Sequence, residues 1–188
     1  MIIDHQRNLV GVPATLLPAL RQSLHQALGE QAPQVLQETG FACGAAAYEA
    51  FSEWLRETVG VTQPEDLDAT FLGETLSDFF SRAGWGALTV EQIGPAALVI
   101  DAQNWVENVR NPAEAESEPV CHFTTGLLAA MLGRLAENVV AVMEVEPKER
   151  AGNVCRFLVG APETLQIVFD GMTEGSDYES LLTATSAG

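Results

Sequence analysis

Two cysteines in the second half of the chain have the residue type and spacing to bind a metal ion. Cys121 directly precedes a stretch without charged side chains, and Cys155 lies in a later segment that reads as a strand. The 188 residues contain only three cysteines, so this pair needs a specific explanation. Four explanations are open: a metal site, part of a ligand cavity, a disulfide, or core packing of small apolar side chains.

The stretch after Cys121 predicts a buried helix. Residues 120–133 carry no charge, but these 14 residues are fewer than the roughly 20 that a membrane span needs. Phe123, Leu127 and Met131 recur at every fourth position, which is typical of an apolar helix face packed on a sheet. Small side chains on a second face favour close packing, and a ligand wall or a subunit contact is the alternative.

The apolar and turn patterns elsewhere predict an α+β domain. We expect helices over residues 14–28, 33–60 and 72–83, and strands over 88–91, 97–101, 139–146, 154–159 and, as a further element, 165–169. This order favours an antiparallel sheet of four to five strands with helices over one face. One domain over residues 1–170 and a flexible acidic tail over 171–188 are expected. Cys43 is predicted to be a small buried residue of the second helix.

The charge of the chain argues against two classes of partner. Twenty-six acidic side chains against nine basic ones give a formal net charge of −17, which repels nucleic-acid phosphates and anionic membrane surfaces. We therefore expect neither nucleic-acid binding nor membrane insertion. The N-terminus has no secretion signal, and three cysteines form no even-numbered disulfide framework, so a reducing cytoplasm is predicted.

Several motifs together resemble the 4-vinyl reductase domain family. The N-terminal half agrees through Leu36–Phe41, followed by Gly44 and Glu49, so that the resemblance spans roughly residues 24–157. The motifs of the C-terminal half are GWG at 84–86, EPVCHF at 118–123, GLLA at 126–129, VME at 142–144 and GNVCRF at 152–157. This family shares a superfamily with vesicle-tethering TRAPP subunits and with the sensor domains of aromatic-responsive bacterial activators.

The resemblance implies a ligand-binding module that is often dimeric. Members hold small hydrophobic or aromatic molecules in an apolar cavity between helices and sheet. We expect a homodimer that senses such a molecule and passes the signal to a protein partner. The cavity is expected to be lined by Trp85, Trp105, His122, Phe123 and Met131, although each could instead be plain core. His122 could point into the cavity or cap the start of the helix.

The resemblance also implies a metal site, with one ligand missing. Carried over residue by residue, the family ligands are Cys121, Glu144 and Cys155, and Pro147 stands where the fourth ligand, a cysteine, would be. Proline offers no side-chain donor, so zinc would need His122 or water to complete its shell. The alternatives are that the two cysteines are buried thiols and that Glu144 forms an ion pair with Arg156 across the hairpin.

Two other functions remain alternatives to ligand sensing. A structural adaptor would use the fold for dimerisation and tethering without a ligand, and would expose an apolar patch. A tetrapyrrole (vinyl) reductase or its accessory protein would need a bound redox cofactor, and the sequence has no glycine-rich nucleotide loop to hold one. An enzyme is the less favoured reading because no activated nucleophile with its base stands out.

Overall fold

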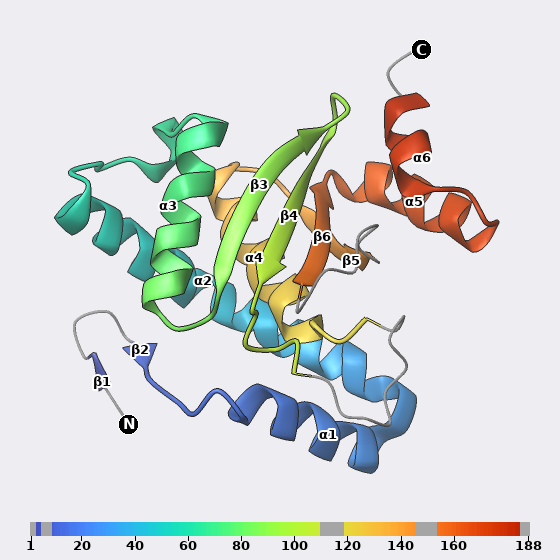
Figure 1. Ribbon diagram of the computed structural model, residues 1–188, viewed down its shortest axis with the longest axis horizontal. Helices are drawn as coiled ribbons and strands as arrows, with labels where there is room; N and C mark the ends of the chain where they lie inside the picture. The colour runs from blue at the N-terminus through green and yellow to red at the C-terminus, as the bar shows by residue number, and fades with distance from the viewer. Residues whose placement is uncertain (1–2, 5–8, 110–118, 146–153, 185–188) are drawn as a thin grey trace.

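The computed structural model shows an α+β fold with a four-stranded antiparallel sheet between two layers of helices, and β1 and β2 form a separate two-stranded sheet (Figure 1). It describes residues 3–4, 9–109, 119–145 and 154–184. The helices are α1 Leu16–Leu28, α2 Ala32–Thr58, α3 Ala69–Arg82, α4 His122–Leu135, α5 Pro162–Thr173 and α6 Tyr178–Ala184. The strands are β1 Ile3–Asp4, β2 Leu9–Val10, β3 Ala87–Ile93, β4 Ala97–Gln103, β5 Ala141–Val145 and β6 Val154–Gly160. The predicted fold class is confirmed.

The helices end where the local chemistry requires it. Gly29 follows α1 with a φ of 56°, in the left-handed region that favours glycine, so the helix ends at residue 28 as predicted. At the start of α3, the Asp68 carboxylate accepts a hydrogen bond from the Phe71 N–H at 2.9 Å.

Among the helices that the structure describes, none is long and apolar enough to cross a membrane.

The four-stranded sheet has the order β3-β4-β6-β5, with every neighbouring pair antiparallel. Alternate residues point to opposite faces, so the register Val90, Ile100, Phe157 and Glu144 lies in one row across the sheet. This face packs against α2, α3 and α4 in the main core, with Ile100 and Phe157 almost fully buried. The Glu144 side chain therefore lies on the face of the sheet that packs against α2, α3 and α4.

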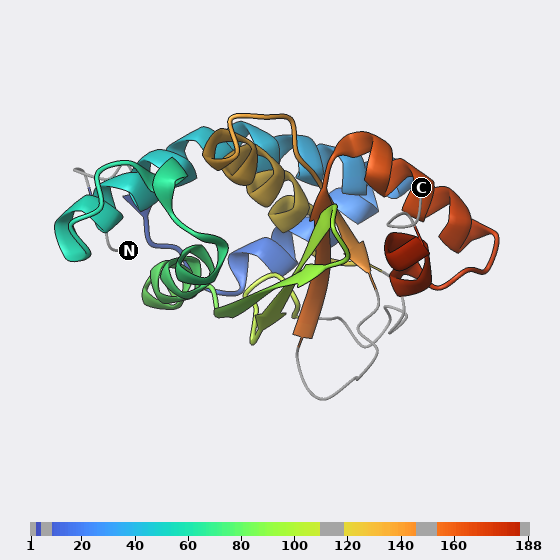
Figure 2. The same ribbon diagram turned by 90° about the horizontal axis from the view of Figure 1, so that it is seen from above.

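Backbone contact between α2 and α4 fixes the distance between the sheet and its helical layer (Figure 2). A Cβ atom on Gly126 would overlap the Gln37 carbonyl oxygen, and one on Gly40 would overlap the Phe123 carbonyl oxygen. The two helices thus cross where both have glycine. Cys43, predicted to be a small buried residue of the second helix, is exposed, because Gly40 and Gly44 occupy the contact instead.

A second, smaller core lies on the opposite face of the sheet, under α5 and α6. The strand predicted over residues 165–169 is wrong: Pro162 starts a helix, and Leu165 and Val168 are buried on its inner side. Within the segment predicted as a flexible tail, α6 buries Tyr178 and Leu182. Helices therefore cover both faces, where one face was expected.

Arg156 lies on this second face and does not reach Glu144. Its guanidinium donates to both carboxylate oxygens of Asp101, at 2.7 and 2.6 Å, and to the Tyr178 hydroxyl at 3.2 Å. The expected ion pair between Arg156 and Glu144 is wrong, because Arg156 pairs with Val145, one residue out of phase with Glu144. The Glu144 side chain lies on the other face of the sheet, toward the start of α4.

The close crossing of α2 and α4 predicts that Gly126→Ala destabilises the fold. The added methyl group overlaps a main-chain oxygen that has no rotamer to change, so we expect a loss of roughly 3 kcal/mol in the free energy of unfolding. Gly133→Ala, in the same helix, is the matched control, because its Cβ would meet the Asn138 oxygen at 3.1 Å and needs only a small shift. Equal urea midpoints for the two variants would contradict the backbone contact.

Candidate functional site

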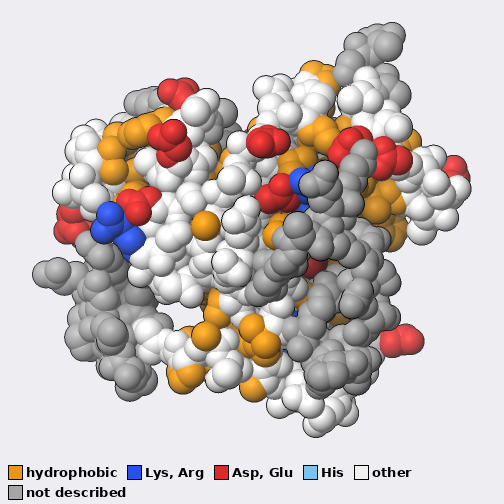
Figure 3. Space-filling model, viewed as in Figure 1, with side chains coloured by type: hydrophobic (Ala, Val, Ile, Leu, Met, Phe, Trp, Pro, Cys, Tyr) orange, Lys and Arg blue, Asp and Glu red, His pale blue; other side chains and the backbone are white. Residues whose placement is uncertain are grey.

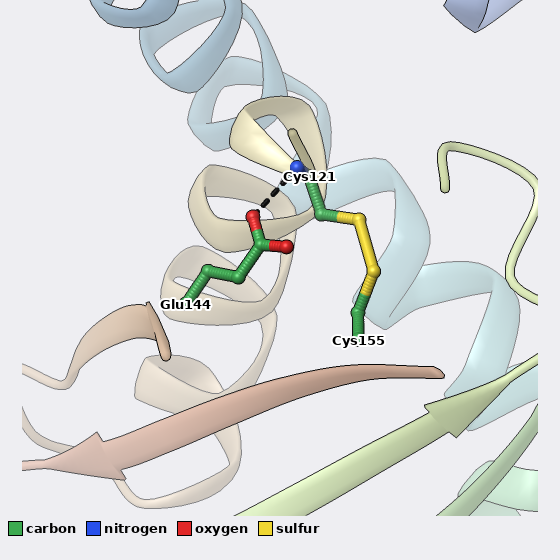
Figure 4. Close-up of side chains that lie close together, drawn as sticks. All are labelled: Cys121, Glu144 and Cys155. Carbon is green, nitrogen blue, oxygen red and sulfur yellow. Dashed lines mark hydrogen bonds between the residues drawn. A yellow bond between two sulfur atoms is a disulfide. The ribbon is translucent and has the colours of Figure 1, made fainter. Parts of the chain in front are cut away.

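The functional residues gather around the first turn of α4. The first N–H groups of a helix have no partner within the helix and form a partly positive end that attracts carboxylates. Glu144 Oε2, from β5, accepts hydrogen bonds from the N–H groups of Val120 at 2.9 Å and Cys121 at 2.7 Å. Figure 4 shows the Glu144 carboxylate turned toward the Cys121 nitrogen. The sheet is thereby tied to the start of α4.

Cys121 and Cys155 meet next to this carboxylate and are joined by a disulfide (Figure 4). Cys121 comes from the N-cap of α4 and Cys155 from β6, and both side chains are buried. One donor atom from each of Cys121, Glu144 and Cys155 lies within 4.8 Å of the other two. The structure therefore brings together all three residues predicted as metal ligands, in a form in which the two sulfur atoms bind each other.

The donor set fits zinc only when the two cysteines are reduced. Two ligands of one tetrahedral zinc ion lie about 3.8 Å apart, so a cluster within 4.8 Å has the right size. A disulfide sulfur has no thiolate charge to offer, so disulfide and zinc are mutually exclusive at this site. His122, considered above for the remaining position, contributes no atom to the cluster, and Pro147 lies outside the described residues.

A second carboxylate, Glu107, caps the same helix from the loop after β4. Its oxygen Oε1 accepts from the Phe123 N–H at 2.9 Å, and Oε2 accepts from the Thr124 N–H at 2.8 Å and the Thr124 hydroxyl at 2.6 Å. Burial raises the pKa of the Glu107 carboxyl, and these hydrogen bonds with the charge of Arg21 oppose the rise. The two backbone N–H donors favour the ionised form of the Glu107 carboxyl, whereas its burial favours the protonated form.

The Thr124 hydroxyl joins this cap to the aromatic core. Trp105 donates its indole N–H to Thr124 Oγ1 at 2.7 Å, and an indole nitrogen can only donate. The Thr124 hydroxyl must therefore accept from Trp105 and give its own proton to Glu107. This directed chain orients the indole ring of Trp105.

Aromatic rings surround Trp105 and extend toward the start of α4. The ring centroids of Trp85 and Trp105 lie 5.6 Å apart, those of Trp85 and Phe123 6.2 Å apart, and those of Phe80 and Trp105 5.3 Å apart. Trp105 is fully buried, whereas Trp85 and Phe123 are half-buried. Three of the five residues predicted to bind a ligand, Trp85, Trp105 and Phe123, thus form one cluster together with Phe80. We call these four residues the aromatic cluster.

The other two predicted ligand residues differ in their surroundings. Met131 is fully buried two turns further along α4, within the main core. His122 is half-buried beside Phe123, at the first residue of α4. Burial lowers the pKa of His122 to about 4, and the charges of His25 and Arg21 act in the same direction, so its imidazole is neutral at pH 7.

Arg21, Glu107 and Thr124 were missed from the sequence. Arg21 stands in a helix whose leucines gave the only signal, and Glu107 lies in a polar connection, 15 residues before the helix that it caps. Helix-capping patterns are local in sequence, so a cap delivered from another element has no such signature. A buried arginine and a buried glutamate become recognisable only from their exposures of 2% and 1%.

Two grooves of the described surface lie away from this site. One, of about 690 Å³, runs between α3 and β3 and has Glu74, Asp78 and Glu91 among its lining residues. The other, of about 420 Å³, lies over α2 and α4 and includes Phe41 and Val139, which are 59% and 72% exposed. Figure 3 shows the face with α3 and the β3–β4 hairpin, where acidic side chains are spread widely and basic ones are few.

Comparison with known proteins gives structural neighbours only. No protein-family model matches the chain. No curated protein matches its sequence either. Among solved structures, the phenol-responsive sensory domain of the transcription activator PoxR, crystallised with phenol, matches with a TM-score of 0.62 at 17% identity, over 86% of this chain and 85% of that one.

A vinyl-4-reductase family protein from Methanocaldococcus jannaschii also matches, with a TM-score of 0.49 and 17% identity, over 81% of this chain and 83% of that one. An H-NOX protein matches with a TM-score of 0.41 and 14% identity, over 81% and 74% of the two chains. The PoxR domain is a sensor domain of the aromatic-responsive kind that the sequence resemblance named. The chain has the α+β fold of the PoxR sensory domain, with the four-stranded antiparallel sheet that the sequence predicted.

Proposed function

We propose that this protein binds a small aromatic or hydrophobic molecule at the aromatic cluster and acts as a sensor. The observation that carries the proposal is the stacking of two half-buried rings, Trp85 and Phe123, at the start of α4, where the neighbouring residue in sequence is the neutral His122. Flat rings offer stacking area, and His122 offers one hydrogen-bonding group that needs no charge to be neutralised. Trp105 packs against Trp85 behind this stack, whereas Met131 lies deeper in the main core.

The likeness to the PoxR sensory domain supports this ligand class, since that domain is phenol-responsive. Phenol combines one ring with one hydroxyl, which is the combination that stacked rings and a neutral imidazole suit. A sensor must also pass on its ligand-bound state, so we propose that a protein partner receives the signal. We propose further that the signalling form is a homodimer and that it acts in a reducing cytoplasm.

Binding of phenol to the purified chain tests the proposal. We expect a dissociation constant on the order of 10–1000 µM by calorimetry, because so small a ligand has few contacts to offer. Phe123→Ala should weaken binding about tenfold by removing a stacking partner. Phe71→Ala is the control: Phe71 is 36% exposed on α3, outside the aromatic cluster, and its loss should leave the affinity unchanged.

Absence of heat with phenol, hydrophobic acids and a tetrapyrrole would refute ligand sensing. It would favour the adaptor function, which the exposed Phe41 and Val139 of the groove over α2 and α4 support. A visible absorbance band in the purified protein would instead favour a bound redox cofactor and the reductase function.

The neutral state of His122 predicts a specific pH dependence of stability. The pKa of His122 is about 4 in the folded chain and near 6.5 when unfolded, so the unfolded chain takes up the proton first as the pH falls. The stabilisation is complete above pH 6.5 and is lost as the pH falls from 6.5 toward 4. We expect the urea midpoint of the wild type to fall more steeply over this range than that of His122→Gln. Parallel curves would show that His122 titrates normally.

We propose further that the reduced chain binds one zinc ion weakly through Cys121, Glu144 and Cys155. The oxidised chain should take up no zinc, because the disulfide removes both thiolates. Competition with a zinc-binding dye, before and after reduction, measures this. Cys155→Ser should abolish uptake, and Cys43→Ser, at the exposed cysteine, should not change it. No uptake by the reduced wild type would leave Cys121 and Cys155 as a structural pair only.

A further inference from the structure

Helix α1 packs on the rest of the chain through the half-buried Leu17, Pro18 and Leu24 and through one fully buried side chain, which is polar. Arg21 is 2% exposed and is the only buried residue of the helix, whereas Leu16, Leu20 and Leu28 are 44%, 37% and 40% exposed. A surface helix is usually held by an apolar stripe, and here a guanidinium occupies the inner position. Figure 1 shows α1 below the sheet, along the edge of the molecule.

The Arg21 guanidinium donates hydrogen bonds to main-chain carbonyl oxygens at both ends of the loop between β4 and α4. Its Nη1 donates to the carbonyl oxygens of Glu107 at 2.8 Å and Val120 at 3.3 Å, and its Nη2 donates to that of Val109 at 2.8 Å. The planar guanidinium holds these donors in fixed directions, so all three bonds depend on the positions of residues 107–109 and 120. A shift of this segment therefore weakens the attachment of α1.

The same segment carries the side chains that orient the aromatic cluster. Trp105 points into the cluster, and the Glu107 carboxylate caps α4 and fixes the Thr124 hydroxyl to which Trp105 donates. The indole of Trp105 and the three carbonyl bonds of Arg21 thus belong to one continuous set of hydrogen bonds. Neither end can move far without changing the geometry at the other.

One side-chain atom in this segment is unsatisfied. Asn108 is 7% exposed, and its Oδ1 is buried with no hydrogen-bond partner among the described residues, although its N–H donates to the Trp105 carbonyl oxygen at 3.0 Å. A buried acceptor without a donor costs free energy, and a rearrangement that supplied a donor would recover it. The position of the Asn108 side chain is therefore held by its neighbours at a cost in free energy.

We propose that Arg21 and Glu107 are positioning residues that couple the aromatic cluster to the docking of α1, so that ligand binding releases α1. The inference rests on the proposed function, and it assigns α1 as the output element of the sensor. The sign follows from packing: Trp105 is fully buried and its neighbouring rings lie 5.3 and 5.6 Å away. A ligand that separates these rings displaces Trp105, disturbs Thr124 and Glu107, and weakens the bonds of Arg21.

Hydrogen exchange of the α1 amides tests the coupling without any ligand. Thr124→Val removes the hydroxyl between Trp105 and Glu107 at nearly constant volume, and we expect the α1 amides to exchange at least about fivefold faster. Thr125→Val is the matched control, because Thr125 is also buried but bonds to the His122 carbonyl of its own helix. Equal α1 exchange in the two variants would overturn the proposal.

Coupling between two sites is reciprocal, so a change at α1 must reach Trp105. Arg21→Gln should speed exchange of the Trp105 indole N–H, a signal assigned by its loss in Trp105→Phe. Arg21→Lys should have an intermediate effect, because an ammonium cannot reproduce the planar fork. Arg82→Gln, at an exposed ion pair on α3, should change nothing. An unchanged indole signal in folded Arg21→Gln contradicts the coupling, and if this variant does not fold, the threonine pair decides.

Phenol provides the test that links the coupling to sensing. In the wild type, saturating phenol should speed α1 exchange and leave that of α5, on the other face of the sheet, unchanged. Arg21→Gln should bind phenol about fivefold more tightly or better, since the ligand no longer has to undock α1. Heat of binding without a change at α1 would refute this inference alone. No heat at all would refute phenol binding, and the threonine pair would still decide the coupling.

Discussion

The start of α4 is the constraint on which the rest of the structure depends. This helix carries no acidic residue in its first turn, so its unpaired N–H groups are satisfied from outside. Glu144 reaches them from β5 and Glu107 from the loop after β4. The partly positive end of α4 stabilises each carboxylate, and each carboxylate thereby holds its own strand or loop against the helix. The sheet edge, the loop and the central helix are therefore placed relative to one another by charge.

The helix start also explains why different chemistries meet there. Cys121 and His122 occupy the N-cap and the first turn because the chain has to enter the helix at this point, and Cys155 arrives beside them on β6. Burial lowers the pKa of His122, so that its imidazole is neutral, whereas the buried Glu107 carboxyl accepts hydrogen bonds from the start of α4. A neutral imidazole, a pair of sulfur atoms and aromatic rings lie side by side in a protein whose net charge is −17.

Much of the fold could be predicted from periodicity, because its long elements pack by simple stripes. The core helix, the β3–β4 hairpin and β6 follow from apolar spacing, and Gly29 and Pro33 mark helix ends. The segment 165–169 was misread because a short apolar run fits a strand or a buried helix turn equally well. Cys43 was misplaced because α2 offers glycines and alanines on adjoining faces, and the pattern does not show which face meets α4.

Only those residues of the candidate site that belong to a recognisable sequence motif could be predicted. Cys121, Glu144 and Cys155 came together as the resemblance implied, whereas Arg21 and Thr124 had no local signal. Their roles depend on contacts between residues 86 and 19 positions apart along the chain. Sequence spacing describes neighbours within one element, and such contacts join different elements.

The glycine contact between α2 and α4 restricts the motions that the helical layer can make. Where two backbones touch at Gly40 and Gly126, neither helix can tilt or rotate about its axis independently without main-chain collision. The 27 residues of α2 and the 14 of α4 are therefore locked together at this crossing, which leaves little room for one helix to shift against the other.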